Sequence, residues 1–198
     1  DSYESVDSGL SDFGRDAVDE MNRVGILIDL SHVGAKTSDD AIRHSKNPVA
    51  YTHCLPSGLK EHQRNKSDEQ LKFIADRGGF IGVTMFPAFL RRGTDSTVVD
   101  YVEAIDYVIN LVGEDCVGFG TDFTQDQDQA FFDWLVHDKG DGRELIAFGE
   151  IINPLGMRTI GEYPNLTQEM LKQGWSEAKI RKILGENWLR VLKDVWGA

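Results

Sequence analysis

Polar side chains that can bind a metal ion or move a proton follow three short apolar runs of the sequence. The pairs that stand directly after these runs are Ser31-His32, Thr52-His53 and Thr121-Asp122. Imidazole nitrogen together with carboxylate oxygen suits zinc or a similar divalent ion. His32 and His53 lie 21 residues apart, which is too far for the local spacing of a zinc finger. The pair can therefore share one ion only if the fold brings two strand ends together.

A purely structural role is open for each of these residues, because a single histidine after a strand is more often hydrogen-bonded within the fold than bound to metal. Their recurrence at three equivalent positions favours the metal hypothesis. Among other residues, Cys54 is interpreted as a small buried thiol, and Arg64 either receives a carboxylate through its planar guanidinium or lies on the surface. The histidines left outside the predicted site are His44, His62 and His137.

The apolar runs alternate with amphipathic segments, a pattern typical of strands that alternate with helices. The strands expected from apolar character cover residues 26–30, 48–51, 80–84 and 116–119. The helices expected from apolar spacing and capping residues cover residues 12–21, 37–45, 67–77, 97–112, 166–173, 177–184 and 186–196. Such an alternation implies βαβ units and a parallel sheet. It fails over residues 123–159, which we expect to form a long loop or insert.

Two α/β architectures fit this order of elements. An open doubly wound sheet that binds a nucleotide needs a glycine-rich phosphate loop, and the nearest match, Gly118-Phe119-Gly120, has Phe123 where the third glycine should stand. An α/β barrel builds its active site at the carboxyl ends of its strands, where the polar pairs lie. We therefore expect an α/β fold, the C-terminal part of a (β/α)8 TIM-type barrel with about four βα units plus closing helices. Residues 1–198 would form one portion of a single domain.

Composition limits the partners of the chain. Its 198 residues carry a formal net charge of −12, a field that repels phosphate backbones, so nucleic acid is not an expected partner. The longest apolar runs fall far short of the roughly 20 residues that cross a bilayer, and no transmembrane segment is expected. Two cysteines cannot build a disulfide framework. The chain begins at Asp1 without methionine, so its cellular compartment stays unknown.

Several blocks of the sequence resemble the membrane (renal) dipeptidase family of zinc metallopeptidases. The blocks that carry the resemblance are Met21 to His32, Pro48 to His53, Gln63-Arg64-Asn65, Val117 to Phe123, Tyr163 to Leu166 and Gly185 to Val191. The most specific feature is Asp-Leu-Ser-His followed 21 residues later by a second histidine. The order and spacing agree with the family from about Gly9 to Thr124. The resemblance covers the C-terminal half of the family.

The resemblance implies an α/β barrel with two zinc ions bridged by a glutamate and a water or hydroxide. It implies that His32 and His53 are ligands of one zinc, so that this chain supplies ligands mainly for one of the two ions in a complete site. It also implies that Arg64 binds the carboxylate of a small dipeptide substrate. Asp122 would be the catalytic residue, near the substrate amine and the tetrahedral intermediate. A water bound to zinc has a pKa of about 7, which gives hydroxide near neutral pH.

Two departures from the family affect these expectations. The family's N-terminal half, which supplies a His-x-Asp pair, the bridging glutamate and a further histidine, is missing. We therefore expect the chain to be the C-terminal part of a longer polypeptide, or to be completed by a partner chain. A half barrel exposes sheet edges, so pairing of copies into a homo-oligomer is a further option. Thr124-Gln125 stand where many relatives have Asp-Gly, which leaves the exact substrate open.

The leading functional hypothesis is zinc-dependent hydrolysis of the peptide bond of dipeptides. A related amide hydrolase, or a tailoring enzyme of a biosynthetic pathway that uses the same site, is the alternative among enzymes. A non-catalytic binding module that has lost the complete bimetal centre is the alternative outside enzymes. The preferred dipeptide, its stereochemistry and the oligomeric state are not determined by the residues of the chain.

Overall fold

Three parallel strands form the centre of the molecule in a computed structural model that describes residues 2–136 and 149–197. The strands are β1 (Ala50–Cys54), β2 (Phe80–Val83) and β3 (Val117–Phe119), hydrogen-bonded in the order β1-β2-β3. A further segment joins the free side of β1, where Asp29 forms an isolated parallel bridge with Ala50. Because all these segments run in the same direction, their carboxyl ends meet at one edge of the sheet.

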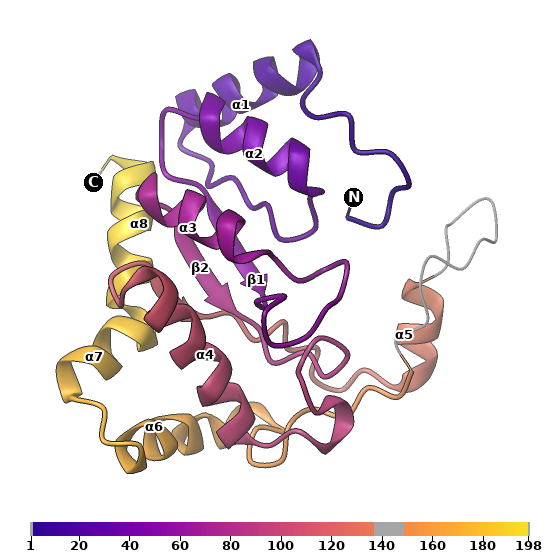
Figure 1. Ribbon diagram of the computed structural model, residues 1–198, viewed down its shortest axis with the longest axis vertical. Helices are drawn as coiled ribbons and strands as arrows, with labels where there is room; N and C mark the ends of the chain where they lie inside the picture. The colour runs from indigo at the N-terminus through magenta and orange to yellow at the C-terminus, as the bar shows by residue number, and fades with distance from the viewer. Residues whose placement is uncertain (1, 137–148, 198) are drawn as a thin grey trace.

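Eight α-helices accompany the sheet within the described residues (Figure 1). They are α1 (Asp12–Val24), α2 (Ala35–His44), α3 (Asp68–Asp76), α4 (Val98–Val112), α5 (Gln129–Leu135), α6 (Tyr163–Lys172), α7 (Glu177–Arg181) and α8 (Asn187–Trp196). The shorter helical segments are the 3-10 turns Gly93–Asp95 and Ile160–Glu162 and the π-helical turn Lys182–Glu186. Among the described residues, none of the helices reaches the length and apolar content that crossing a bilayer requires.

Capping residues determine where several helices begin and end. The Ser11 hydroxyl accepts the N–H of Gly14 at the start of α1, and Gly25 ends that helix with a left-handed φ of 76°. Ser67 and Gln70 form a capping box at the start of α3, in which each side chain accepts a backbone N–H of the other residue. The predicted starts of both helices are confirmed.

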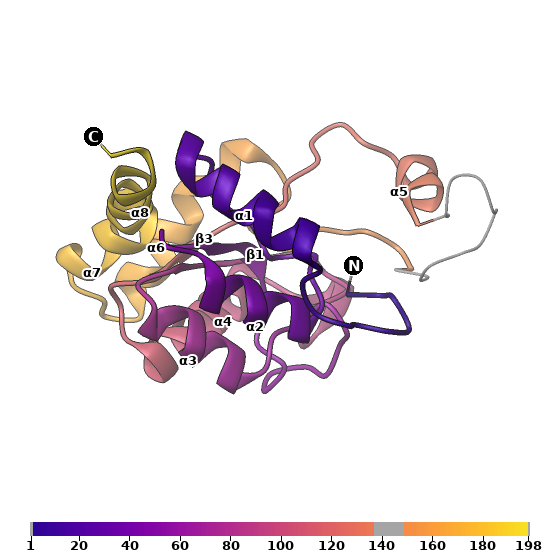
Figure 2. The ribbon, with the colours of Figure 1, turned by 90° about the horizontal axis from the view of Figure 1, so that it is seen from above.

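Different helices cover the two faces of the sheet. The helices α2, α3 and α4 cover one face of the sheet, as Figure 2 shows. Tyr51 and Ile81 are fully buried in the core to which these helices contribute. The opposite face carries Ala50 and Phe80, the first residues of β1 and β2, which pack against α8. The ring centroids of Phe80 and Trp188 are 3.9 Å apart. Since α8 covers the amino end of this face, the carboxyl end with the polar pairs stays available for a site.

The regular pairing of β1 with β2 breaks at Thr52 and His53, where the register shifts. The backbone N–H of Thr52 donates to the carboxylate of Asp29 instead of a strand carbonyl. Gly82 and Gly120 leave room for the displaced backbone, because a Cβ atom at either position would overlap the carbonyl oxygen of Thr52. Irregularities of this kind re-aim side chains at the end of a strand.

The strand predicted over residues 26–30 is reduced to the bridge at Asp29, so that prediction was wrong in extent. Ala50 exchanges two backbone hydrogen bonds with this segment. The next donor along β1, the N–H of Thr52, binds the Asp29 side chain and so cannot continue the ladder. The other three predicted strands are present, with β1 running on to Cys54.

The long loop predicted over residues 123–159 contains the helix α5, which sequence reasoning missed. α5 has seven residues, and the Asp128 carboxylate caps its amino end by accepting the N–H of Phe131. An apolar run this short cannot be assigned to helix or strand by periodicity. Residues 137–148, which include His137, lie outside the described residues. The other predicted helices are present with shifts of a few residues at their ends.

Candidate metal centre

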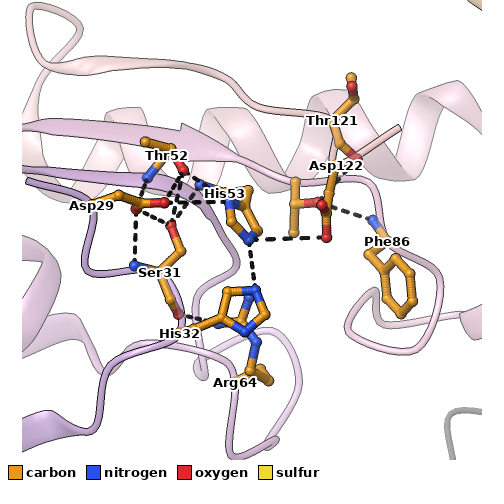
Figure 3. Close-up of polar contacts among 10 residues, drawn as sticks. Asp29, Ser31, His32, Thr52, His53, Arg64, Phe86, Thr121 and Asp122 are labelled. Atoms are coloured by element: carbon orange, nitrogen blue, oxygen red, sulfur yellow. Dashed lines mark hydrogen bonds and ion pairs between the residues drawn. The ribbon is translucent and has the colours of Figure 1, made fainter. Parts of the chain in front are cut away.

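The side chains of His32 and His53 meet at the carboxyl end of the sheet (Figure 3). Their Nε2 atoms lie 3.0 Å apart, and their ring centroids are 5.0 Å apart with the ring planes inclined at 56°. His32 comes from the turn after the Asp29 bridge, and His53 comes from the irregular end of β1. Two neighbouring segments of the sheet therefore present imidazole nitrogens to one point.

The His53 ring is held from the side opposite His32. Its Nδ1 lies 2.8 Å from Thr52 Oγ1, and the Thr52 hydroxyl donates to Asp29 Oδ2 at 2.7 Å. The backbone N–H of His53 donates to Ser31 Oγ at 3.0 Å. We call this set of hydrogen bonds among Asp29, Ser31, Thr52 and His53 the Asp29 network. It restrains both the ring and the backbone of His53.

The Asp29 carboxylate is the centre of the Asp29 network. Its Oδ1 accepts the backbone N–H groups of Ser31 and Thr52 at 3.0 and 3.1 Å, together with the Ser31 hydroxyl. Burial acts to raise the pKa of Asp29, but the hydrogen bonds from Ser31 and Thr52 outweigh burial and lower the pKa below its ordinary value. The carboxylate is ionised at neutral pH, and it acts as a hydrogen-bond acceptor alone.

His32 is held less tightly than His53. Its Nε2 faces His53, and among the described residues no group is hydrogen-bonded to its Nδ1. Burial lowers the pKa of His32 to about 4, and the positive charges of Arg64 and of a protonated His53 act in the same direction. The ring is therefore neutral at neutral pH, which is the form of histidine that binds metal.

Asp122 reaches the same point from the segment after β3. Its backbone has a φ of 58°, in the left-handed region that residues other than glycine rarely adopt. In this conformation its Oδ2 lies 4.0 Å from His53 Nε2. The carbonyl oxygen of Thr121 accepts the hydroxyl of Thr84 at 3.2 Å, which ties the turn to the end of β2. A carboxylate at this position can bind a cationic group beside the two histidines.

Arg64 is buried beside His32, with 2% of the residue exposed (Figure 3). Its guanidinium donates to the carbonyl oxygen of Ser31 and lies over the Phe89 ring, 5.4 Å from the ring centroid. Its backbone N–H donates to Nδ1 of His62. Burial lowers the pKa of Arg64, but the group stays charged because its ordinary value is above 12. A guanidinium has five N–H donors, and the bond to Ser31 uses one of them.

The two histidine nitrogens fit part of a zinc site. Two Zn–N bonds of about 2.0–2.1 Å at a tetrahedral angle place their nitrogens roughly 3.4 Å apart. The observed separation of 3.0 Å is close to that value. Within the described ranges, no three His, Cys, Asp or Glu side chains form a set that could hold an ion. Since a catalytic zinc site uses three protein ligands, the two histidines alone would not complete one.

The other side chains singled out in the sequence have structural surroundings. Cys54 is a buried free thiol, and burial raises its pKa to about 12, which disfavours a thiolate ligand. His44 ends α2, with its Nε2 3.3 Å from the carboxylate of Asp19. His62 packs on Phe89 with ring centroids 4.6 Å apart. These contacts account for the three residues without a ligand.

Sequence reasoning missed the contribution of Asp29 and Thr52 to the orientation of His53. A signal for Asp29 is present in the sequence, because this carboxylate interrupts an otherwise apolar run. A carboxylate in such a run needs hydrogen-bond donors nearby, and small hydroxyl residues next to both histidines can supply them. Which of these hydroxyl groups would reach Asp29 depends on the register between the two segments.

Comparison with known proteins identifies the family. The family model described as Membrane dipeptidase (Peptidase family M19) matches residues 1–137 and 142–197. The chain belongs to this family. Among solved structures, that of a metallo peptidase from Rhodobacter sphaeroides liganded with a phosphinate mimic of the dipeptide L-Ala-D-Ala has a TM-score of 0.78 and 30% sequence identity. That match covers 96% of this chain and 48% of the other.

Two further relatives have a higher sequence identity to this chain than the Rhodobacter sphaeroides protein. The crystal structure of an amidohydrolase from Pseudomonas aeruginosa has a TM-score of 0.97 and 65% identity, and it covers 100% of this chain and 60% of that one. A Klebsiella pneumoniae protein described as "Uncharacterized protein in pqqA 5'region" is 33% identical over 192 residues, 95% of this chain and 62% of that protein. This M19 chain therefore spans less than two thirds of the length of these relatives.

Proposed function

We propose that this chain is part of a zinc-dependent dipeptidase in which His32 and His53 bind one of the metal ions. The observation that carries the proposal is the 3.0 Å approach of two imidazole nitrogens at the carboxyl end of a parallel sheet. Membership of the membrane dipeptidase family supports the same conclusion. The net charge of −12 also suits a cation better than an anion.

We further propose that the sheet is the C-terminal part of a (β/α)8 barrel and that residues 1–198 are one portion of a single domain. The parallel strand order supports this, as do the helices α2 to α4 on one face and α8 at the amino end of the other. The greater length of the relatives supports a further portion that would supply the other strands and metal ligands. The polar pairs then lie where barrel enzymes place their active sites.

The residues of this chain would bind and orient a small zwitterion. Zinc in such a site supplies a Lewis acid for the scissile carbonyl and lowers the pKa of water. The Asp122 carboxylate, 4.0 Å from His53 Nε2, would receive the ammonium group of the substrate and exchange a proton at Oδ2. Arg64 would receive the substrate carboxylate through its remaining N–H donors. These opposite charges lie on different sides of the histidine pair and match the two ends of a dipeptide (Figure 3).

Two observations on relatives bear on the substrate. The Rhodobacter sphaeroides metallo peptidase is liganded with a mimic of L-Ala-D-Ala, which supports a dipeptide as the substrate class. The Pseudomonas aeruginosa structure, at 65% identity, is named an amidohydrolase, which supports a related amide hydrolase or tailoring enzyme as the second candidate. The segment after Asp122 would then contact a substrate other than a dipeptide.

The test uses the full-length protein that carries this chain, purified with its metal. We expect elemental analysis to give two zinc ions per chain, and a panel of L,L and L,D dipeptides to include substrates whose hydrolysis stops when a chelator removes zinc. Bound zinc without turnover of any dipeptide would favour the amide hydrolase. A full-length protein that binds no zinc would overturn the proposal and leave the non-catalytic module.

Substrates with one blocked end separate the roles of the two charged residues. Asp122→Asn should raise KM for a free dipeptide but not for the N-acetylated form, which has no ammonium group to bind, and it should lower kcat for both forms because Oδ2 also exchanges a proton. Arg64→Met should raise KM for the free dipeptide and leave KM for the C-terminal amide unchanged. Equal effects of each variant on the KM of both forms of its substrate would contradict the assigned binding roles.

A further inference from the structure

The hydrogen bonds around His53 determine where protons lie. Because the Asp29 carboxylate only accepts, the Thr52 hydroxyl uses its one proton in the 2.7 Å bond to Oδ2. The Ser31 hydroxyl uses its proton in the same way, in the bond to Oδ1. The contact between the two hydroxyl oxygens is longer, at 3.2 Å, and does not compete for either proton.

Thr52 Oγ1 therefore faces His53 Nδ1 as an acceptor, at a distance of 2.8 Å. An imidazole nitrogen that faces an acceptor carries the ring proton, so the proton of a neutral His53 is on Nδ1. The lone pair is then on Nε2, the atom that is directed toward His32 and Asp122 (Figure 3). This is the tautomer in which His53 can bind a metal through Nε2.

We propose that Asp29 and Thr52 are positioning residues that hold His53 in the Nδ1–H tautomer, so that its Nε2 is prepared for metal before metal binds. The inference rests on the proposed function, because the prepared nitrogen serves a purpose only if His53 is a ligand. Outer partners of metal-bound histidines act in this way, and their loss typically weakens metal binding about 10–100-fold. The second arm of the network, from Asp29 through Ser31 to the backbone N–H of His53, holds the ring's position.

The same geometry makes the two histidines unequal. Two lone pairs cannot face each other at 3.0 Å without a proton or a cation between them. Since the Asp29 network places a lone pair on His53 Nε2, His32 carries its proton on Nε2 in the metal-free protein and donates it to His53. Metal binding then moves the His32 proton to Nδ1, whereas His53 keeps its tautomer. One ligand is preset and the other one switches.

Long-range proton–nitrogen NMR of isotope-labelled histidines in the full-length protein tests this assignment, because it distinguishes protonated from unprotonated ring nitrogens. We expect His53 to have a protonated Nδ1 and an unprotonated Nε2 both before and after zinc is added. We expect His32 to change from Nε2–H to Nδ1–H on addition of zinc. The metal-free spectrum gives a readout that does not depend on activity.

Variants of Thr52 show whether the hydroxyl is the cause. Thr52→Val should let His53 populate both tautomers and weaken zinc binding about 10–100-fold, and Thr52→Ser should restore the values of the unaltered protein. Thr121→Val is the matched control, because Thr121 precedes Asp122 as Thr52 precedes His53. The Thr121 hydroxyl contacts the hydroxyl of Tyr163 at 3.1 Å instead of a histidine ring. The control should leave tautomer and zinc affinity unchanged.

Asp29→Asn gives a second, independent variant. Its side-chain amide can donate to Thr52, which would release the Thr52 proton toward His53 Nδ1 and favour the Nε2–H tautomer. A protonated Nε2 on His53 in the unaltered metal-free protein would overturn the proposal while leaving the proposed function intact, as would an unchanged tautomer and zinc affinity in Thr52→Val. A full-length protein that binds no zinc would instead overturn the proposed function, and the inference with it.

Discussion

Two parts of the molecule end at the same edge of the sheet but are held in different ways. The histidine region, residues 29–32 and 52–53, is tied together by the Asp29 network, whose bonds measure 2.5 to 3.1 Å. The aspartate segment, residues 121–136 and 149–162, contains the positive φ of Asp122 and the short helix α5. Trp134 in α5 is 53% exposed.

In the proposed function, the histidine region binds metal and the aspartate segment contacts the substrate. Side chains locked by hydrogen bonds on rigid elements can hold a ligand geometry within narrow limits. Loops and short exposed elements tolerate more change in sequence, and binding specificity commonly lies in them. On this proposal, substrate preference varies with the sequence of the aspartate segment while the histidine region is preserved.

The largest expected effect comes from removing a proposed zinc ligand in the histidine region. His53→Ala in the full-length protein should reduce zinc affinity by more than the roughly 100-fold that loss of an outer partner can cause, because a nitrogen ligand itself disappears. Competition with a metal-binding dye measures this. His44→Ala is the control, since His44 ends α2 beside Asp19. The zinc affinity of this variant should match that of the unaltered protein. Equal zinc affinity in both variants would contradict the assignment of His53.

A substitution in the packing beneath the histidine region should have the next largest effect. The Cβ atom of Gly82→Ala would overlap the Thr52 carbonyl oxygen, so we expect a loss of about 1–3 kcal/mol in the free energy of unfolding and weaker zinc binding. Gly161→Ala places its Cβ 3.8 Å from the nearest heavy atom in the aspartate segment, and its effect should stay within about 0.5 kcal/mol. Urea unfolding compares the two, and similar values would remove the contrast between the regions.

A substitution of Asp122 in the aspartate segment should raise the free energy of unfolding instead of lowering it. Asp122→Gly removes the penalty of about 1–2 kcal/mol for a left-handed backbone at φ 58°, and the greater entropy of glycine in the unfolded chain offsets about half of it. The free energy of unfolding should therefore rise by about 0.5–1 kcal/mol while dipeptide hydrolysis is lost. Asp122→Asn removes the charge but tolerates this conformation, so it should lose hydrolysis at nearly unchanged stability. A destabilised Asp122→Gly protein would show that the conformation of Asp122 is not strained.

The smallest effect concerns a buried cation under the histidine region. Lys66 donates to the carbonyl oxygen of Val33, and burial lowers its pKa from 10.5 to about 8. Between these values the unfolded chain binds more protons than the folded chain, so stability rises with pH. From pH 8 to 9 the rise should be up to about 1 kcal/mol. Above pH 9 the raised pKa of Cys54 acts with the opposite sign.

The change that isolates this contribution is Lys66→Met, which removes the titrating amine and keeps an apolar side chain of similar length. Stability curves measured by urea unfolding at pH 7, 8 and 9 should be flatter for the variant than for the unaltered protein. Parallel curves would mean that Lys66 is not the group that releases its proton in this range.

Much of the fold could be predicted because its signals are local. Ser11, Gly25 and the Ser67 capping box mark helix ends within a few residues of sequence, and apolar runs mark the strands. The positions of His32 and His53 after two such runs predicted their meeting, because parallel strands bring their carboxyl ends together. The helix α5 was missed, since a segment of seven residues is too short to have a clear period.

Residue types and spacing were sufficient to indicate an α/β chain with a pair of histidines and a carboxylate at one edge of a parallel sheet, and the resemblance of several sequence blocks indicated the family. The orientation of those groups depended on contacts between distant segments. The Thr52 N–H donates to Asp29 across 23 residues of sequence. This bond ends the pairing of the strand predicted over residues 26–30, and it lies beside the point where His53 faces His32. A linear pattern does not specify such a bond, because it forms only when strand register has placed donor and acceptor side by side.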